Sequence, residues 1–250
     1  MGYIIALAGK GGTGKTTIAA LIVRLIKEKK LGSILAVDAD PNSNLHESLG
    51  VELKQTIGGI IDEMCQDPQK VPAGVSKDAY MEYEIETAIS EGSGFAVLTM
   101  GRPEGPGCYC YANNVLRNVM GKLIKDYDYV IIDNEAGLEH LSRRTTRSAD
   151  ALVVVSDATK VGLKAAQRIN DLARELKIKV KKSFLLVNQC AQDIEEEKIK
   201  GLGLDYLGSL PMDKQIEQFS LNGRPLMGLE DDAASIVTLK KIGGKIWQGN

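Results

Sequence analysis

Short apolar runs recur along the chain, and most are followed by a longer stretch whose apolar positions have helical spacing. The runs are rich in β-branched residues and often end in a polar residue, which is typical of parallel strands buried on both faces. They are Tyr3–Ala8, Ile34–Asp38, Phe95–Met100, Tyr129–Asp133, Ala151–Val155 and Phe184–Asn188. Helices are predicted over Lys15–Lys29, Ala112–Lys125, Leu138–Ala149, Lys160–Leu176 and Asp232–Trp247. The alternation predicts an α/β fold: a doubly wound, mostly parallel sheet flanked by helices, with ligands at the carboxyl ends of the strands.

The 250 residues contain no internal repeat, low-complexity tract or linker, so we interpret residues 1–250 as a single domain. Leu45–Gly92 is the least regular region. It holds GGIIDEM, a Pro/Gly stretch and a predicted helix over Lys77–Ser90. We interpret residues 45–92 as an insertion on the sheet.

Charge and composition exclude several classes of protein. There are 31 basic and 33 acidic residues, so nothing indicates a nucleic-acid partner. No apolar stretch approaches the roughly 20 residues of a membrane span, and the N-terminus lacks the features of a signal peptide. We therefore expect a cytoplasmic protein. The four cysteines are too scattered for a secreted disulfide scaffold, and Cys65 and Cys190 are interpreted as small buried apolar residues.

A glycine-rich loop follows the first predicted strand. It matches G-x-x-x-x-G-K-[ST], and its residues are Gly9, Lys10, Gly11, Gly12, Thr13, Gly14, Lys15, Thr16 and Thr17. In this motif backbone N–H groups surround phosphate oxygens, the lysine (Lys15) reaches the β- and γ-phosphates, and the hydroxyl of Thr16 ligates Mg²⁺. A glycine-rich turn that binds nothing is the alternative. The position between a strand and a helix favours the nucleotide site.

Lys10 adds a second lysine at the start of the loop. With it, KGGTGKT resembles the deviant Walker A motif of a class of dimeric ATPases. This class includes MinD, the nitrogenase iron protein and the arsenical pump ATPase. The resemblance implies a SIMIBI-type P-loop fold in which Lys10 reaches the partner's nucleotide; in the alternative it serves only its own phosphates or solvent. Asp38-Ala39-Asp40-Pro41 resembles the family's switch I, where Asp40 would position the attacking water. Val130–Gly137 resembles its Walker B and switch II, where Asp133 would hold Mg²⁺ through water. Glu135 stands where the family usually has proline.

The sixth strand ends in Asn188, without the Asn-Lys-x-Asp of GTP-specific proteins. In the same family such an asparagine contacts adenine, and a later loop closes over the base. That loop resembles Leu210-Pro211-Met212-Asp213, which adds Pro211, Met212 and Asp213 to the nucleotide contacts. Asp213 is equally well interpreted as a helix N-cap. ATP is the expected nucleotide.

Two cysteines, Cys108 and Cys110, lie one residue apart in GPGCYCY. On an extended backbone their thiolates would share one face and chelate a metal, but structural Zn²⁺ takes four ligands and Ni²⁺ accepts four sulfurs. No further cysteine or histidine lies nearby, so a two-fold axis would supply the other pair. Lys10 independently suggests such a dimer. A disulfide, buried structural cysteines and a bridging [4Fe–4S] cluster remain alternatives, although the predicted switch II contains no cysteine.

Together, KGGTGKTT, DADP, GRPEGPGCYC and DNEAGLEHL resemble the CooC/AcsF family over nearly the whole chain. The resemblance implies a homodimeric ATPase with ATP/ADP and Mg²⁺. It would carry Ni²⁺ (or Zn²⁺) on Cys108 and Cys110 and assist nickel insertion into a client, carbon monoxide dehydrogenase or acetyl-CoA synthase. Two other classes stay open: an iron–sulfur reductase or cluster carrier, and a MinD-like spatial regulator. The tail LKKIGGKIWQGN is short and interrupted by glycines, so no membrane anchor is expected.

Overall fold

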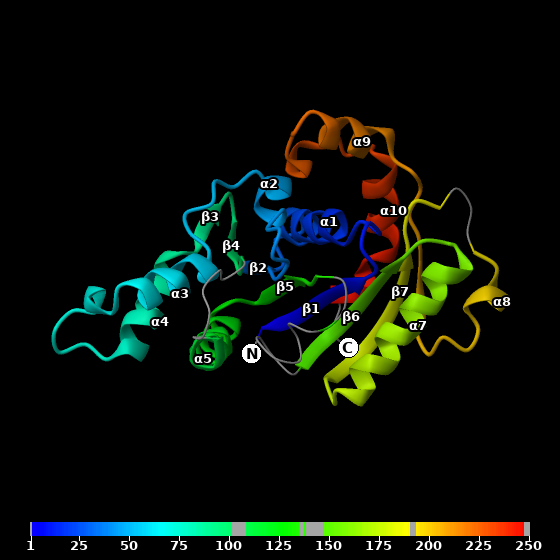
Figure 1. Ribbon diagram of the computed structural model, residues 1–250. Helices are drawn as coiled ribbons and strands as arrows, with labels where there is room; N and C mark the ends of the chain where they lie inside the picture. Colours follow the sequence, from blue (N-terminus) through cyan, green and yellow to red (C-terminus); the bar gives the residue numbers. More distant parts are fainter. Residues whose placement is uncertain (1, 102–108, 136–137, 139–147, 191–193, 248–250) are drawn as a thin grey trace.

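The computed structural model describes residues 2–101, 109–135, 138, 148–190 and 194–247 (Figure 1). Among these residues eight strands form one sheet, in the order β3-β4-β2-β5-β1-β6-β7-β8. All neighbouring strands are parallel except β3 and β4, which are antiparallel. The strands are β1 (Tyr3–Gly9), β2 (Ile34–Asp38), β3 (Ser90–Gly92), β4 (Phe95–Thr99), β5 (Tyr129–Asp133), β6 (Ser148–Ser156), β7 (Lys179–Val187) and β8 (Asp205–Ser209). The predicted doubly wound, mostly parallel sheet is confirmed.

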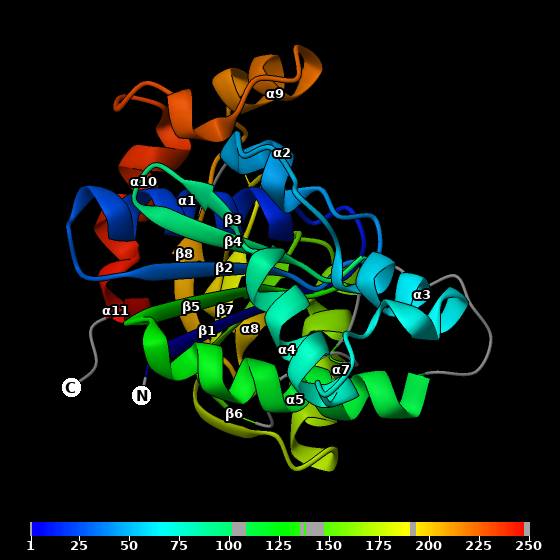
Figure 2. The same cartoon turned by 90° about the vertical axis from the view of Figure 1, so that its left-hand side faces the viewer.

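Two hydrophobic cores lie on opposite faces of the sheet, which explains why its strands are apolar at consecutive positions. In β1, Ile5 and Leu7 face one core, and Ile4 and Ala6 face the other. The first core is closed by α1 (Lys15–Glu28), α2 (Leu45–Leu49), α10 (Ala234–Ile242) and α11 (Gly244–Trp247). The second is closed by α3 (Ile57–Gln66), α4 (Lys77–Thr87), α5 (Tyr109–Asp126) and α7 (Lys160–Glu175). Figure 2 shows α1 and α5 on opposite sides of the strands.

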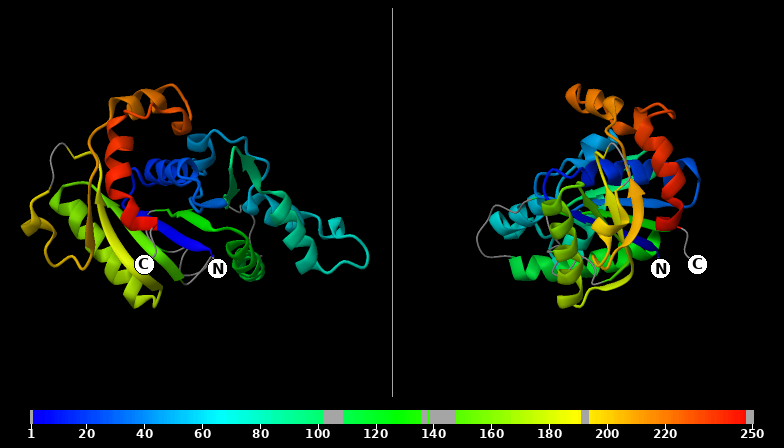
Figure 3. Two further views of the ribbon diagram at one scale, coloured as in Figure 1. Left: turned by 180° about the vertical axis from the view of Figure 1, so that it is seen from behind. Right: turned by 90° about the vertical axis from the view of Figure 1, so that its right-hand side faces the viewer.

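Within residues 45–92, α2 packs against α1, whereas α3, the short helix η1 (Pro68–Lys70) and α4 lie at one edge of the molecule, away from α7 and α8 (Glu196–Ile199) (Figure 3). Their apolar side chains, among them Ile57, Met81 and Ile85, still join the core. The predicted helix over Lys77–Ser90 is too long, because α4 ends at Thr87 and Ser90 starts β3.

Other boundaries also differ from the prediction. The predicted helix Leu138–Ala149 ends too late, because β6 begins at Ser148; residues 139–147 lie outside the described part. Strand β7 begins at Lys179, earlier than the predicted start at Phe184. Its first residues are polar because this part of the strand is only partly buried. The predicted helix Asp232–Trp247 is divided at Gly243, where a Cβ would lie 2.6 Å from the carbonyl oxygen of Leu239. Strand β8 was not predicted, and helix α9 (Lys214–Leu221) was anticipated only through the interpretation of Asp213 as a helix N-cap.

Candidate functional site

The phosphate loop joins the carboxyl end of β1 to the start of α1, as the motif requires. Gly12 and Gly14 have φ values of 79° and 88°, in the left-handed region that glycine adopts without penalty. A Cβ on Gly14 would lie 2.4 Å from Asn188 Nδ2, and one on Gly9 would lie 2.3 Å from the carbonyl oxygen of Val155. A Cβ on Gly11 would meet nothing within 4 Å, so Gly11 lies on the open side of the loop.

Lys15 is buried at the start of α1, and its Nζ donates to the carbonyl oxygen of Lys10 at 3.4 Å. The hydroxyl of Thr13 donates to the same carbonyl at 2.9 Å. Gly14 caps α1 without a side-chain hydrogen bond, so no side chain of the cap competes for the N–H groups of the first turn. A buried ammonium beside uncapped helix N–H groups is the arrangement that binds phosphate. The Lys10 side chain is exposed.

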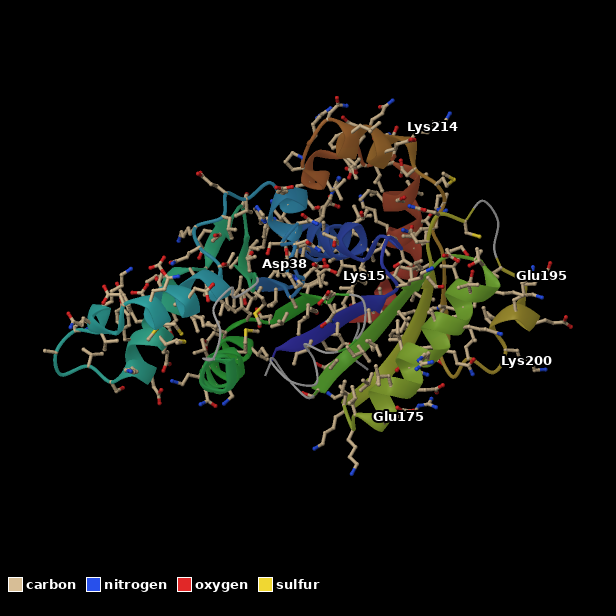
Figure 4. All side chains as sticks on the ribbon, viewed as in Figure 1. Lys15, Asp38, Glu175, Glu195, Lys200 and Lys214 are labelled. Atoms are coloured by element: carbon tan, nitrogen blue, oxygen red, sulfur yellow. The ribbon has the colours of Figure 1, made fainter. Side chains whose placement is uncertain are left out.

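Two buried aspartates stand beside the loop, at the ends of β2 and β5. Asp38 and Asp133 are partners in the register of these strands. The Thr16 hydroxyl donates to Asp133 Oδ2 at 2.6 Å, whereas Asp133 Oδ1 is buried without a hydrogen-bond partner. Burial raises the pKa of Asp38 to about 6 and that of Asp133 to about 7. Figure 4 labels Lys15, on α1, and Asp38, at the end of β2, near the middle of the molecule.

This donor set fits a Mg²⁺ ion. The ion prefers oxygen ligands and is held by one or two protein groups together with waters and phosphates. The Thr16 hydroxyl and the unpartnered oxygen of Asp133 are oxygens of the required kind beside a phosphate loop. Within the described residues, no three His, Cys, Asp or Glu side chains gather into a metal cluster. The site therefore suits an ion that arrives with its nucleotide.

Asp38 holds the segment that carries Asp40, a contribution that the sequence did not reveal. Its Oδ1 accepts from the Asp40 N–H at 3.1 Å, and its Oδ2 accepts from the Leu45 N–H at 2.8 Å. The Asp40 carboxylate is turned back onto the segment, where Oδ1 accepts from the backbone and side-chain amides of Asn42. The sequence identifies Asp38 only as part of the DADP motif, because hydrogen bonds from both ends of a loop leave no local pattern.

A cavity of about 490 Å³ adjoins the phosphate loop and suits a nucleotide base. It is lined by Gly14, Thr17, Asn188, Gln189, Pro211, Met212 and Asp213, with neighbouring residues of α1, α9 and α10. The Asn188 amide donates from Nδ2 to the carbonyl oxygen of Thr13 at 2.9 Å and so joins the loop to the cavity. No sequence pattern singles out Gln189, which also lines the cavity. Its φ of 57° is unusual for a residue other than glycine.

Asp213 caps two helices, which supports the capping interpretation. Its Oδ1 accepts from the Gln215 N–H at 3.0 Å at the start of α9, and its Oδ2 accepts from the Ser235 N–H at 2.7 Å in α10. Met212 is 73% exposed at the mouth of the cavity. The two helices are thus held around the cavity by one carboxylate.

The structure describes only one of the two cysteines of the Cys-x-Cys pair. Cys108 lies outside the described residues, whereas Cys110 lies in the first turn of α5, which begins at Tyr109. The expectation of an extended backbone is therefore wrong at Cys110. The helix predicted from Ala112 begins three residues earlier. Cys65 is exposed, contrary to the expected buried position, and Cys190 is half-buried against the core.

Comparisons with known proteins agree with this geometry. The family model described as an AAA domain matches residues 2–186. An uncharacterised ATP-binding protein of Methanocaldococcus jannaschii is 44% identical over 248 residues, which cover 97% of this chain and 98% of that protein. The carbon monoxide dehydrogenase accessory protein CooC of Rhodospirillum rubrum is 29% identical over 226 residues, 85% of each chain.

The fold has close structural counterparts as well. The septum site-determining protein MinD of Pyrococcus horikoshii, complexed with Mg-ADP, matches with a TM-score of 0.73 and 22% identity, covering 99% of this chain and 97% of that one. None of the helices in the described ranges has the length and apolar character needed to cross a bilayer. The chain belongs to the AAA-domain family of P-loop ATPases and has the MinD-type fold.

Proposed function

We propose that this protein is a homodimeric, ATP-hydrolysing metallochaperone. It takes up Ni²⁺ (or Zn²⁺) as cargo on Cys108 and Cys110 and delivers it to carbon monoxide dehydrogenase or acetyl-CoA synthase. The observation that carries the proposal is the similarity to CooC over 85% of both chains, in a chain that also has a complete phosphate loop. Residues 1–250 would form one ATPase domain acting in the cytoplasm.

The base cavity favours adenine over guanine. The carbonyl of Thr13 can only accept a hydrogen bond, so it fixes Asn188 with Nδ2 toward the loop. Any polar group that Asn188 offers a base is then the acceptor Oδ1. The amino group of adenine donates at the position where guanine carries an accepting oxygen. An acceptor from Asn188 would therefore attract adenine and repel guanine.

The phosphates would lie against the loop and the start of α1. Lys15 would move its ammonium from the weak contact with the Lys10 carbonyl, at 3.4 Å, to the β- and γ-phosphates. Thr16 and Asp133 would hold Mg²⁺, which supplies charge neutralisation at the phosphates. Asp40 would orient the attacking water once its carboxylate leaves Asn42. The exposed side chain of Lys10 is free to reach the partner subunit's nucleotide.

The cargo site would form on the two-fold axis, where two Cys-x-Cys pairs give four thiolates. Cys110, in the first turn of α5, would supply one of the two thiolates of each subunit. Nucleotide can drive transfer only if the two states of the dimer bind the metal with unequal affinity. ATP would favour the state that releases the ion, and hydrolysis would restore the other.

Metal loading and client activation test the proposal with four proteins. Wild type, Cys65→Ser, Lys15→Ala and the double variant Cys108→Ser/Cys110→Ser are loaded anaerobically with Ni²⁺ and assayed for metal content. They are then mixed with each apo-client and Mg-ATP. We expect metal on all but the double variant, and client activation only by wild type and the exposed-cysteine control Cys65→Ser. A double variant with wild-type metal content would refute the cargo site, and activation by Lys15→Ala would refute the need for ATP.

The two other classes have less support. Ile246 and Trp247 in the C-terminal helix are buried in the core, so they are not offered to a lipid surface as a MinD-like anchor would be. An iron–sulfur protein would show broad charge-transfer absorption in an anaerobic spectrum of the loaded protein. Such absorption would overturn the nickel assignment.

A further inference from the structure

Thr99, the last residue of β4, carries a buried hydroxyl that no feature of the proposed function explains. The residue is fully buried, and its Oγ1 has no hydrogen-bond partner. Burying a hydroxyl unpaired costs free energy, and valine would fill the same space without that cost. A second state of the protein in which the hydroxyl is paired would account for the threonine.

The register of the sheet identifies the partner. Thr99 is paired with Asp38 between β4 and β2. Val97 and Ala36, two residues earlier in each strand, both face the core under α1. Side chains two residues apart share a face, so Thr99 and Asp38 also point toward α1 and the phosphate loop. Adjacent strands lie about 4.8 Å apart, so a rotating hydroxyl is close enough to serve the neighbouring carboxylate.

The Asp38 carboxylate is occupied in this structure by the segment 39–44. It accepts from the N–H of Asp40 at one end and from that of Leu45 at the other. Ser43 within the segment has a φ of 55°, in the left-handed region that is unfavourable for serine. Strained backbone held by a few hydrogen bonds is typical of segments with two arrangements. When the segment moves, the buried carboxylate loses a donor.

We propose that Thr99 is the replacement donor for Asp38 and thereby a positioning residue of the nucleotide site. When a γ-phosphate draws Asp40 away, the Thr99 hydroxyl donates to the carboxylate oxygen that the Asp40 N–H releases. The hydroxyl is unpaired without nucleotide and paired in the triphosphate state, so it lowers the free energy of that state relative to the other. The inference rests on the proposed nucleotide site and is independent of the cargo.

Burial supports the need for a second donor. The Asp38 carboxyl is completely buried, and this burial raises its pKa to about 6 despite the two backbone N–H groups that it accepts from. The end of β4 is also tied to the same residue, because the Met100 N–H donates to the backbone carbonyl of Asp38 at 2.8 Å. Thr99 therefore stays beside Asp38 when the segment 39–44 moves.

Thr99→Val and Thr99→Ser separate this role from simple packing. For each variant the Tm is measured without nucleotide, and Kd values are measured for Mg-ADP and for Mg-bound AMP-PNP, an ATP analogue that is not hydrolysed. We expect Thr99→Val to have a Tm at or above wild type and an unchanged Kd for Mg-ADP. Its Kd for AMP-PNP rises about tenfold, as expected for loss of one hydrogen bond to a charged group. Thr99→Ser keeps the hydroxyl, so it retains the wild-type ratio of the two Kd values.

The outcomes are distinguishable. A lower Tm for Thr99→Val, or equal weakening of both nucleotides, would show a packing role and overturn the inference. An unchanged affinity of Thr99→Val for both nucleotides would overturn it too, while leaving the proposed function intact. If the wild type bound neither nucleotide, the proposed ATPase site itself would fail together with the inference.

Discussion

Asn188→Ala tests the link between the base cavity and the phosphate loop. The asparagine is 8% exposed, and its Nδ2 donates at 2.9 Å to the carbonyl of Thr13, a residue far away in the sequence. Truncation leaves that carbonyl without its donor, and an unsatisfied buried group costs about 1–3 kcal/mol. For a chain of this size we expect the Tm to fall by roughly 2–10 °C.

The affinity for nucleotide should fall as well, because the loop loses the contact that fixes Thr13 beside Gly14. We expect a Kd for a fluorescent ATP analogue about tenfold higher, in line with about 1.4 kcal/mol of lost preorganisation. Asn188→Asp should be worse than Asn188→Ala, since a carboxylate oxygen would face the Thr13 carbonyl and repel it. Calorimetric melts and nucleotide titrations measure both effects.

Asn222→Ala is the matched control. Asn222 also donates from Nδ2 to a backbone carbonyl, that of Gln218, at 2.7 Å, but the bond is exposed to water. Its removal should change the free energy of unfolding by no more than about 0.5 kcal/mol. If Asn188→Ala and Asn222→Ala behaved alike in both assays, the buried amide would not support the loop and the reasoning would be refuted.

Four further substitutions address the phosphate loop and Asp133. Gly14→Ala should lower the Tm and weaken nucleotide binding, because the new Cβ would lie 2.4 Å from Asn188 Nδ2 at a φ of 88°. Gly11→Ala is the control, since a Cβ there meets open space and should leave the Tm unchanged. Equal Tm values for the two variants would contradict this reasoning. Lys10→Ala should keep wild-type stability, since the side chain is exposed, but lose the ATP-dependent shift in sedimentation; a normal shift would show that Lys10 does not bridge subunits. Asp133→Asn should raise the Tm, because it removes a buried charge, and should abolish the Mg²⁺ dependence of nucleotide affinity; retention of that dependence would exclude Asp133 as the metal's support.

Much of the fold could be predicted from local patterns. Strands such as Ile34–Asp38 and Tyr129–Asp133 have the predicted bounds, because burial on both faces requires consecutive apolar residues. The loop from Gly9 to Thr17 could be predicted equally well, because each of its roles depends on a residue type at a set spacing. Asn188 and the segment around Pro211 were placed near the base only through the family resemblance, and the structure puts both at one cavity.

Other features depend on contacts between distant parts of the chain. Strand β3 and the first half of β7 are too polar to match the apolar pattern of buried strands. Their conformation depends on pairing with the neighbouring strands of the sheet. The exposure of Cys65 depends on which face of α3 meets the core.

The sequence by itself determined the doubly wound sheet and the phosphate loop, because both are written in residues that are neighbours along the chain. Only the tertiary structure decided how Asp38 holds the segment of Asp40, how Asn188 supports Thr13, and that Thr99 is paired with Asp38 in the register of β4 and β2. These relations join residues from separate strands and loops. Their energies depend on burial and on distances that exist only once the sheet has formed.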